Sequence, residues 1–151
     1  MMRLLPLVLV LAASACTSDH VRFTAEHDRL TAATCSPTGG DANGPDQCAT
    51  DSDCSNGGVC SCAGTTFEWS HQTRNLCVPA ACHVDADCGS FACSPTLSEC
   101  GSFYGIQGYY CHAADDQCGG DADCVQSGRQ GHCVYTPEVS HWTCSYSFCA
   151  G

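Results

Sequence analysis

The sequence Cys48-Ala-Thr-Asp-Ser-Asp-Cys54 occurs again, with changes, as Cys82-His-Val-Asp-Ala-Asp-Cys88 and as Cys118-Gly-Gly-Asp-Ala-Asp-Cys124. In each copy five residues separate two cysteines, and an Asp-x-Asp tripeptide directly precedes the second cysteine. Repetition at a steady period is the sequence signature of a repeat architecture. The phrase therefore predicts a chain built from similar units.

The later cysteines follow the same period. Cys77, Cys111 and Cys144 are 34 and 33 residues apart, close to the spacing of the Asp-x-Asp phrases. We therefore predict cysteine-rich repeats at 48–81, 82–117 and 118–151. Short aromatic runs and turn residues inside each repeat predict β-hairpins and turns with little regular secondary structure.

The cysteine content predicts a small disulfide-rich fold. The chain has 17 cysteines in 151 residues, far above the level typical of a disulfide scaffold. Its large aliphatic residues are sparse, and each disulfide that closes a long loop contributes about 2–4 kcal/mol by restricting the unfolded chain. Sixteen cysteines are expected to form disulfides: Cys35, Cys48, Cys54, Cys60, Cys62, Cys77, Cys82, Cys88, Cys93, Cys100, Cys111, Cys118, Cys124, Cys133, Cys144 and Cys149.

The N-terminal residues predict export and lipidation. Arg3 is followed by an apolar run from Leu4 to Ala13 that is too short for a stable transmembrane helix. Residues 1–15 are typical of a signal peptide, and Ala13-Ser14-Ala15-Cys16 resembles the lipobox of bacterial lipoproteins, with Cys16 as the lipidated residue. An ordinary secretory signal, with Cys16 incidental, is the alternative. We expect an outer-membrane or cell-surface protein of a Gram-negative bacterium, anchored through lipid and a flexible tether at 16–47.

Cysteine parity constrains the pairing. Without Cys16 the count is even, but the first and second repeats hold five cysteines each. At least one disulfide must therefore leave each of these repeats. Cys62–Cys100 is the simplest prediction, with Cys35 and Cys149 as competing partners. Such bonds would cross-link neighbouring repeats into one stiff unit.

The charge of the chain excludes one class of partner. Without Arg3 the chain has 4 basic and 16 acidic residues, so its formal charge is 4 − 16 = −12. A nucleic-acid partner is therefore not expected. Solubility at a crowded cell surface explains the charge, and a cationic partner is the alternative. A protein or glycan partner of unknown identity is also considered.

The Asp-x-Asp tripeptides have two interpretations. Clustered carboxylates are calcium ligands, and Asp51-Ser-Asp53-Cys-Ser55-Asn-Gly begins like an EF-hand loop, but Cys62 stands where that loop needs glutamate. The alternative, which we favour, is that each Asp-x-Asp-Cys opens a one-turn helix and caps free backbone N–H groups. Zinc is disfavoured because exported cysteines are oxidised. We expect no metal and no cofactor.

The aromatic side chains also have two interpretations. On a rigid scaffold, flat rings stack on sugars or anchor a protein partner. The candidate binding residues are Trp69, Tyr104, Tyr109, Tyr110 and Trp142. The interpretation that we favour is that they form the core. Two glycines in 103–110 predict a hairpin there, and Thr136-Pro-Glu predicts a turn between two strands.

Two resemblances to known proteins support the prediction of cysteine-rich repeats in an exported protein. The Cys-x5-Cys phrase with Asp-x-Asp, continued by Ser55-Asn-Gly-Gly-Val-Cys60, resembles the Dickkopf N-terminal-type cysteine-rich repeat, and EB modules and whey acidic protein domains have similar phrases. The longer pattern, including Cys93-Ser-Pro and Trp142-Thr-Cys, resembles uncharacterised cysteine-rich lipoproteins of myxobacteria. The resemblance covers about residues 48–151 and implies an outer-surface protein without an assigned activity.

These observations lead to a first functional hypothesis and two alternatives. The first is a non-enzymatic, lipid-anchored surface protein that acts as a binding or structural module. The second is a protease inhibitor that presents a disulfide-braced loop, 63–76 or 101–110, with Gln72-Thr-Arg74-Asn as the bait. The third is an exported hydrolase with a His, an acid and a Ser gathered in one cleft, although no catalytic motif is present in the sequence.

Overall fold

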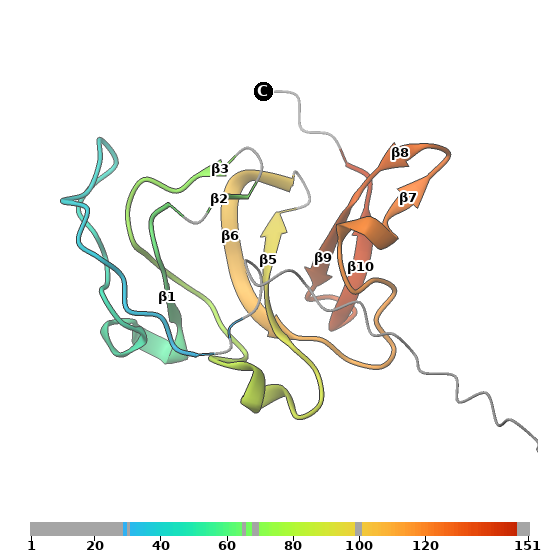
Figure 1. Cartoon of the computed structure of the whole chain (residues 1–151), viewed down its shortest axis with the longest axis horizontal. Helices are drawn as coiled ribbons and strands as arrows, with labels where there is room; N and C mark the ends of the chain where they lie inside the picture. Colours follow the sequence, from blue (N-terminus) through green and yellow to red (C-terminus); the bar gives the residue numbers. More distant parts are fainter. Residues whose placement is uncertain (1–28, 30, 65, 68–69, 99–100, 148–151) are drawn as a thin grey trace, which may run out of the picture.

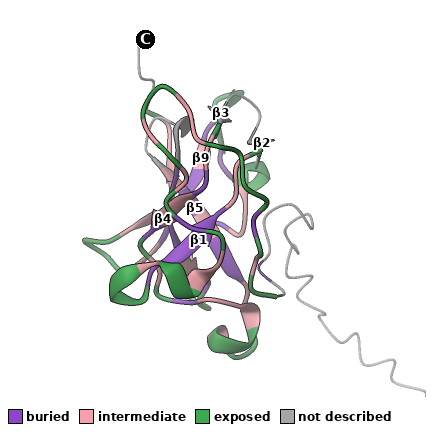
Figure 2. Cartoon of the chain, turned by 90° about the vertical axis from the view of Figure 1, so that its left-hand side faces the viewer, coloured by how far each residue is buried: buried purple, intermediate pink, exposed green. Residues whose placement is uncertain are grey.

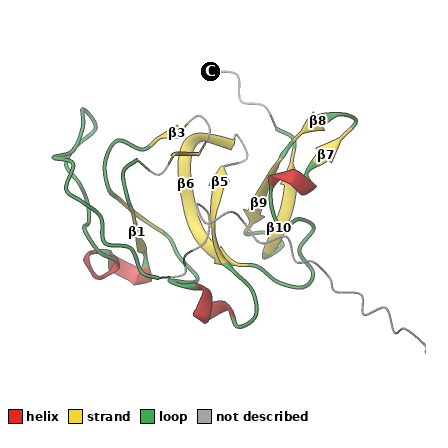
Figure 3. Cartoon of the chain, viewed as in Figure 1, coloured by secondary structure: helices red, strands yellow, loops and turns green. Residues whose placement is uncertain are grey.

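The chain folds into short antiparallel strand pairs joined by turns, and the part that the structure describes contains no α-helix. The computed structural model describes residues 29, 31–64, 66–67, 70–98 and 101–147. Its strands are β1 (Val59–Ser61), β2 (Thr66–Phe67), β3 (Ser70–His71), β4 (Leu76–Val78), β5 (Cys93–Ser98), β6 (Gly101–Cys111), β7 (Val125–Gln126), β8 (Arg129–Gln130), β9 (His132–Thr136) and β10 (His141–Ser145). Its 3₁₀ helices are η1 (Asp51–Asp53), η2 (Ser55–Gly57), η3 (Asp85–Cys88) and η4 (Asp121–Asp123). Figure 3 shows this mixture of hairpins and turns, which confirms the predicted fold class.

The three main strand pairs lie side by side in the order of the chain. Figure 1 shows β1 at one end, the β5–β6 pair in the middle and the β9–β10 pair at the other end. Strand β6 contacts β3 and β4 of the preceding segment, and β5 contacts β9 of the following one. Each strand pair therefore packs against its neighbours in sequence.

The disulfides repeat in the same order along the chain. The first cysteine of each Asp-x-Asp phrase pairs with the cysteine on the first strand of its main hairpin, and the second pairs with the cysteine on the opposite strand. The first set is Cys48–Cys60, Cys82–Cys93 and Cys118–Cys133, with Cα–Cα distances of 5.8, 5.9 and 5.9 Å. The second set is Cys54–Cys77, Cys88–Cys111 and Cys124–Cys144, with distances of 5.4, 5.3 and 5.3 Å.

Strand pairing explains this order. In each main hairpin the two strand cysteines stand opposite each other: Cys60 faces Cys77, Cys93 faces Cys111, and Cys133 faces Cys144. Because opposed residues of an antiparallel pair place their side chains on the same face, both cysteines present sulfur to one side of the hairpin. The Asp-x-Asp phrase lies on that side and supplies both partners.

A seventh disulfide ties the first segment to residues that precede it. Cys62 pairs with Cys35, with a Cα–Cα distance of 5.1 Å, so the predicted Cys62–Cys100 bond is wrong and its competitor Cys35 is the partner. None of the disulfides in the described part of the chain joins two of the predicted repeats. Cys100 and Cys149 lie outside the described residues. The expected cross-link between repeats is therefore replaced, for the first repeat, by a bond that runs back towards the N-terminus.

Part of the predicted tether belongs to the fold. The Cys35 N–H donates to the Ala49 carbonyl at 2.7 Å, and Thr34 and Thr50 form an isolated β-bridge. With the Cys35–Cys62 disulfide, these contacts fix the region before the first Asp-x-Asp phrase. The prediction of a flexible tether up to residue 47 is therefore wrong for this region, and residues 16–28 lie outside the described part of the chain.

Cystine sulfur provides much of the buried core. The cluster between the first two hairpins contains Val59, Val78, Ile106 and Tyr109 together with Cys82 and Cys93. A second cluster consists of Cys35, Cys48 and Cys60, with the half-buried cysteines around them. Figure 2 shows that the buried residues follow the strands, whereas the turns are exposed. Disulfides thus replace the aliphatic side chains that the sequence lacks.

The long strand β6 contradicts the hairpin predicted within 103–110. It pairs with β5 from Cys93 opposite Cys111 to Ser98 opposite Gly101, with register shifts beyond Thr96. Gly108 serves close packing instead of a turn. A Cβ atom at this position would lie 2.8 Å from the Tyr110 ring and 3.0 Å from the Pro79 carbonyl oxygen.

The turn predicted at Thr136-Pro-Glu is confirmed. Strand β9 ends at Thr136 and β10 begins at His141, with Trp142 opposite Tyr135. The Val139 and Ser140 N–H groups both donate to the Thr136 carbonyl, and this closes the turn. Proline at the position after Thr136 suits such a turn because its φ angle is preset.

Candidate functional site

The first aspartate of each Asp-x-Asp tripeptide binds the backbone of its own hairpin. Its Oδ1 atom accepts a hydrogen bond from the N–H of the third cysteine in the segment. The donor–acceptor distances are 2.9 Å for Cys60 to Asp51, 2.8 Å for Cys93 to Asp85 and 2.8 Å for Cys133 to Asp121. The same bond in three segments shows that this carboxylate holds the turn against the strand.

The second aspartate of the tripeptide caps the turn itself. Asp53 Oδ2 accepts hydrogen bonds from the Ala49 and Thr50 N–H groups, both at 2.8 Å. Asp87 accepts from His83 and Val84 at 2.7 and 3.1 Å, and Asp123 accepts from Gly119 at 2.8 Å. These backbone N–H groups lower the pKa of Asp53 and of Asp87 below the ordinary value. The two acids therefore bind different parts of the backbone.

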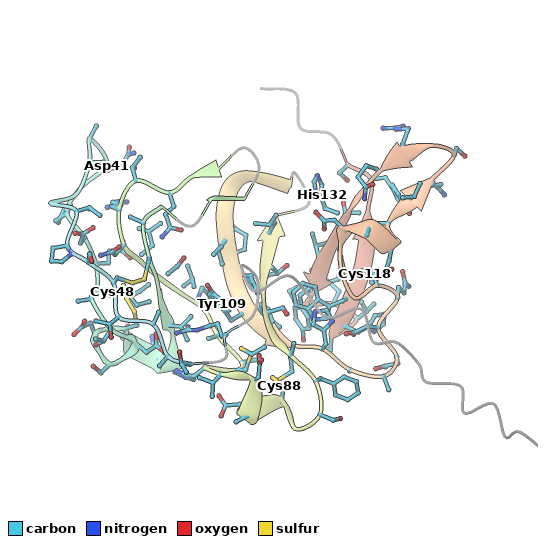
Figure 4. All side chains as sticks on the ribbon, viewed as in Figure 1. Asp41, Cys48, Cys88, Tyr109, Cys118 and His132 are labelled. Carbon is cyan, nitrogen blue, oxygen red and sulfur yellow. A yellow bond between two sulfur atoms is a disulfide. The ribbon has the colours of Figure 1, made fainter. Side chains whose placement is uncertain are left out.

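This geometry supports the capping interpretation over calcium binding. Oδ1 of the first aspartate and Oδ2 of the second already accept backbone N–H groups. The remaining Oδ2 of Asp51 pairs with Arg29 at 2.9 Å, and that of Asp121 lies 3.1 Å from Nδ1 of His132. Figure 4 places His132 in the third hairpin segment. We assign no calcium site to these tripeptides.

Replacing Asp85 by alanine tests the role of the first aspartate. The D85A variant leaves the N–H of Cys93, a fully buried residue, without its acceptor. An unsatisfied buried donor costs about 1–3 kcal/mol, so we expect that loss in the free energy of unfolding of the oxidised protein. Denaturation monitored by circular dichroism measures it.

The residue between the two acids supplies the matched control. Ala86 is exposed, and serine occupies the same position in the first phrase. The A86S variant should change the free energy of unfolding by no more than about 0.5 kcal/mol. An equal loss in D85A and A86S would contradict the capping role of Asp85.

A further aspartate, not identified from the sequence, precedes two of the phrases. Asp46 and Asp116 each stand two residues before the first cysteine, in the shared sequence Asp-Gln-Cys. Asp46 Oδ1 accepts the N–H of Asn75 at 2.8 Å, and Asp116 Oδ1 accepts that of Trp142 at 3.0 Å. Both donors lie two residues before the cysteine on the second strand of the hairpin, Cys77 or Cys144. The repeated tripeptide was the signal that would have predicted this contact.

The ionised form of Asp46 contributes to stability at neutral pH. Hydrogen bonds from the Thr38 hydroxyl and from backbone N–H groups lower the pKa of Asp46 from 3.8 to about 2. A carboxyl group with a lowered pKa stabilises the fold fully above the unfolded-state pKa, and this contribution is lost as pH falls through the folded-state pKa. The melting temperature should therefore fall between pH 3.8 and about 2.

The D46N variant identifies the source of this pH dependence. Its amide side chain does not ionise, so its melting temperature should lie below that of the parent protein at neutral pH. The two melting temperatures should converge as pH approaches 2, where Asp46 becomes protonated. A constant difference across the whole pH range would show that Asp46 does not contribute through its charge.

Arg29 lies buried between the first and second hairpin segments. Its Nη2 atom lies 3.0 and 2.9 Å from the two carboxylate oxygens of Asp51, and its guanidinium carbon is 4.9 Å from the centroid of the Tyr109 ring. Its N–H donates to the Cys93 carbonyl, and its carbonyl accepts the Asp85 N–H. One residue thus contacts both segments through its side chain and its backbone.

The aromatic residues predicted as a binding surface mostly belong to the interior. Tyr109 is 8% exposed and Trp142 is 1% exposed, so neither is available to a ligand. Tyr110 is half-buried and stacks on Tyr135 with a centroid separation of 3.9 Å. Trp69 and the side chain of Tyr104 lie outside the described residues. For Tyr109 and Trp142 the binding interpretation is wrong, because both rings are buried in the packing within and between the hairpins.

The proposed inhibitory loops do not present a free substrate-like segment. The side chain of Arg74, the centre of the predicted bait, lies 3.7 Å from Asp41 and donates to the Pro45 carbonyl at 3.4 Å. Gln72 donates from Nε2 to the Ser61 and Arg74 carbonyls. The second loop, 101–110, is part of strand β6. The described residues of both loops are therefore held in the fold, which counts against the inhibitor hypothesis.

Histidine–aspartate pairs serve the fold as well. His112 Nδ1 lies 2.8 Å from Asp116, and His83 Nδ1 lies 3.5 Å from Asp51. In both pairs the carboxylate also accepts a backbone N–H. Burial lowers the pKa of His112 despite the adjacent carboxylate. These pairs resemble structural anchors, and we assign them no catalytic role.

Cysteine sulfurs gather in groups that would suit zinc if they were thiolates. One group is Cys48, Cys54 and Cys77, whose sulfurs lie within 4.8 Å of one another, and the other two segments have comparable groups. All three residues form disulfides, and only thiolate sulfur binds zinc in such sites. Oxidation therefore explains the clustering.

Comparison with known proteins identifies no relative of this chain. No protein-family model, no curated protein and no solved structure matches the chain. Among the described residues, no helix has the length and apolar character needed to cross a bilayer.

Proposed function

We propose that this chain is a non-enzymatic, lipid-anchored extracytoplasmic protein that acts as a disulfide-stapled structural or binding module. The observation that carries the proposal is the complete pairing of the cysteines in the described part of the chain, where 14 cysteines form seven disulfides. Disulfides persist in oxidising compartments and are rare in a reducing cytosol. The seven disulfides are therefore what we expect of a chain exported to an oxidising compartment.

The cysteine count supports a special role for Cys16. Seventeen cysteines less the 14 in described disulfides leave three, namely Cys16, Cys100 and Cys149. Because three is odd, one of them has no disulfide partner within the chain. Lipidation of Cys16 explains this, since the lipid occupies the sulfur and leaves an even number to pair. Several acyl chains on one residue would give a stable anchor.

The chemistry of the acids supports a structural or binding role over catalysis. The carboxylates that would be the natural acid–base groups accept backbone hydrogen bonds in the Asp-x-Asp turns. The chain without Arg3 also has a formal charge of 4 − 16 = −12, and a strongly acidic, disulfide-stapled chain favours a module that binds or spaces other components.

Metabolic labelling tests the anchor. The full chain, expressed in a Gram-negative host with an alkyne analogue of palmitate, should carry label and fractionate with membranes. The C16S variant should lose the label and become soluble while retaining the described disulfides. A parent protein that is unlabelled and soluble, or a C16S variant that keeps the label, would overturn the proposal of lipidation at Cys16.

A further inference from the structure

Two disulfides of the first segment are in direct contact. The sulfur of Cys35, which pairs with Cys62, lies 3.4 Å from the sulfur of Cys60, which pairs with Cys48. Cys35 and Cys60 are 3% and 1% exposed, so the contact is shielded from solvent. Figure 4 shows disulfide sulfur beside the labelled Cys48. In each segment the sulfurs of two neighbouring disulfides also gather within 4.8 Å of one another.

Such a contact has a chemical consequence. Disulfides exchange when a thiolate attacks one sulfur of a disulfide, and the rate depends on which sulfur the thiolate can reach. We propose that the Cys35–Cys62 and Cys48–Cys60 disulfides form an exchange pair. Reduction of the first by an external dithiol transfers Cys35 to Cys60 and leaves Cys48 and Cys62 as thiols.

The reaction balances in two steps. A thiolate of the dithiol attacks Cys62, the Cys35–Cys62 bond breaks, and its electron pair leaves on the Cys35 sulfur. The second thiol of the reductant then releases Cys62 as a thiol, and the reductant becomes a cyclic disulfide. Next, the Cys35 thiolate attacks Cys60, and the electron pair of the Cys48–Cys60 bond leaves on Cys48, which takes a proton from water. One disulfide is reduced overall, by two electrons and two protons.

Exposure sets the direction of attack. Cys62 is half-buried, whereas Cys35, Cys48 and Cys60 are all buried. Among these four cysteines an external thiol therefore meets Cys62 first, and the Cys35 thiolate that it releases is already beside Cys60. The product keeps the N-terminal segment attached to the hairpin but frees Cys48, the first residue of the Asp-x-Asp phrase. The exchange pair would thus let a reductant loosen this turn without detaching the segment.

Limited reduction of the native chain tests the exchange. The oxidised protein is treated with substoichiometric dithiothreitol, quenched with acid, alkylated with N-ethylmaleimide and cleaved before aspartate, which separates Cys35 from Cys48 at Asp41 and Asp46. Cys60 and Cys62 remain on one peptide. Where Cys62 is alkylated, we expect Cys60 to be linked to the Cys35 peptide and label to appear on Cys48. Linkage of that Cys60 to the Cys48 peptide, with label on Cys35, would overturn the proposal.

The C62A variant produces the free Cys35 thiol without a reductant. It leaves Cys35 as a thiol beside Cys60, so the label should shift from Cys35 to Cys48 in the purified protein. Label that stays on Cys35 would overturn the proposal, and if this variant does not fold, limited reduction of the native chain decides. The matched control is C111A, which frees Cys88 in the second segment, where the sulfurs of Cys82, Cys88 and Cys111 lie within 4.8 Å of one another. Equal transfer in C111A would show that the 3.4 Å contact does not direct the exchange.

Discussion

The R29A variant should lose about 3–5 kcal/mol of unfolding free energy, because it leaves the carboxylate of Asp51 buried without its partner. The side chains of Arg29 and Asp51 are only 6% and 13% exposed. The substitution also removes the cation over the Tyr109 ring. Because Arg29 contacts both the first and the second hairpin segment, the loss should appear as weaker association between them. Calorimetry of the oxidised protein measures the change.

Arg74 provides the matched control for this prediction. It also pairs with an aspartate, but its side chain and that of Asp41 are more exposed, at 20% and 19%, and the distance is 3.7 Å. Solvent screens such a pair, so R74A should change the melting temperature little. An R29K variant keeps the charge but not the planar guanidinium, and should recover only part of the loss. If R29A and R74A lower the melting temperature equally, Arg29 does not hold the segments together.

The sequence predicts correctly those parts of the fold that depend on residues close together in the chain. The Asp-x-Asp turns depend on a few neighbouring residues, because a short carboxylate reaches the N–H groups of its own turn. Short aromatic runs on either side of Thr136-Pro-Glu likewise mark two strands and the turn between them. For the same reason the disulfide-rich class followed from composition alone, since so few aliphatic residues cannot form a core.

Contacts between residues that are far apart in the chain could not be predicted from neighbouring residues. Parity required a disulfide to leave the first repeat but did not distinguish Cys35 from Cys100 as the partner of Cys62. Arg29 stands among polar residues in a stretch without cysteine, and nothing in its neighbourhood indicates that it is buried against Asp51. Such pairings depend on the packing of whole segments, which has no local signal.

Glycine in the middle segment misled the sequence interpretation for a specific reason. Gly108 is one of the two glycines within 103–110 that predict a hairpin, because glycine adopts turn conformations easily. In the fold the same residue allows the Pro79 carbonyl and the Tyr110 ring to approach the strand. The absence of a side chain serves both purposes, and sequence alone does not separate them.

The W142A variant should be the other large loss, again about 3–5 kcal/mol, because the indole is fully buried. Its ring stacks on His112 with a centroid separation of 4.3 Å and meets the Tyr135 ring edge-on at 6.0 Å. Its Nε1–H donates to the Cys111 carbonyl at 3.2 Å, which joins the third hairpin to strand β6 of the second. Truncation would leave a cavity and an unsatisfied carbonyl at this junction. Chemical denaturation followed by far-UV circular dichroism measures the loss.

The W142F variant separates packing from hydrogen bonding. Phenylalanine preserves an aromatic face for His112 and Tyr135 but has no donor for the Cys111 carbonyl. Because the net value of a hydrogen bond is about 1 kcal/mol, most of the W142A loss should be recovered if packing dominates. Val139 supplies the exposed control, since it is 49% exposed and V139A should change stability by no more than about 0.5 kcal/mol. A W142A variant as stable as V139A would mean that the third hairpin does not depend on this indole for its attachment to the second.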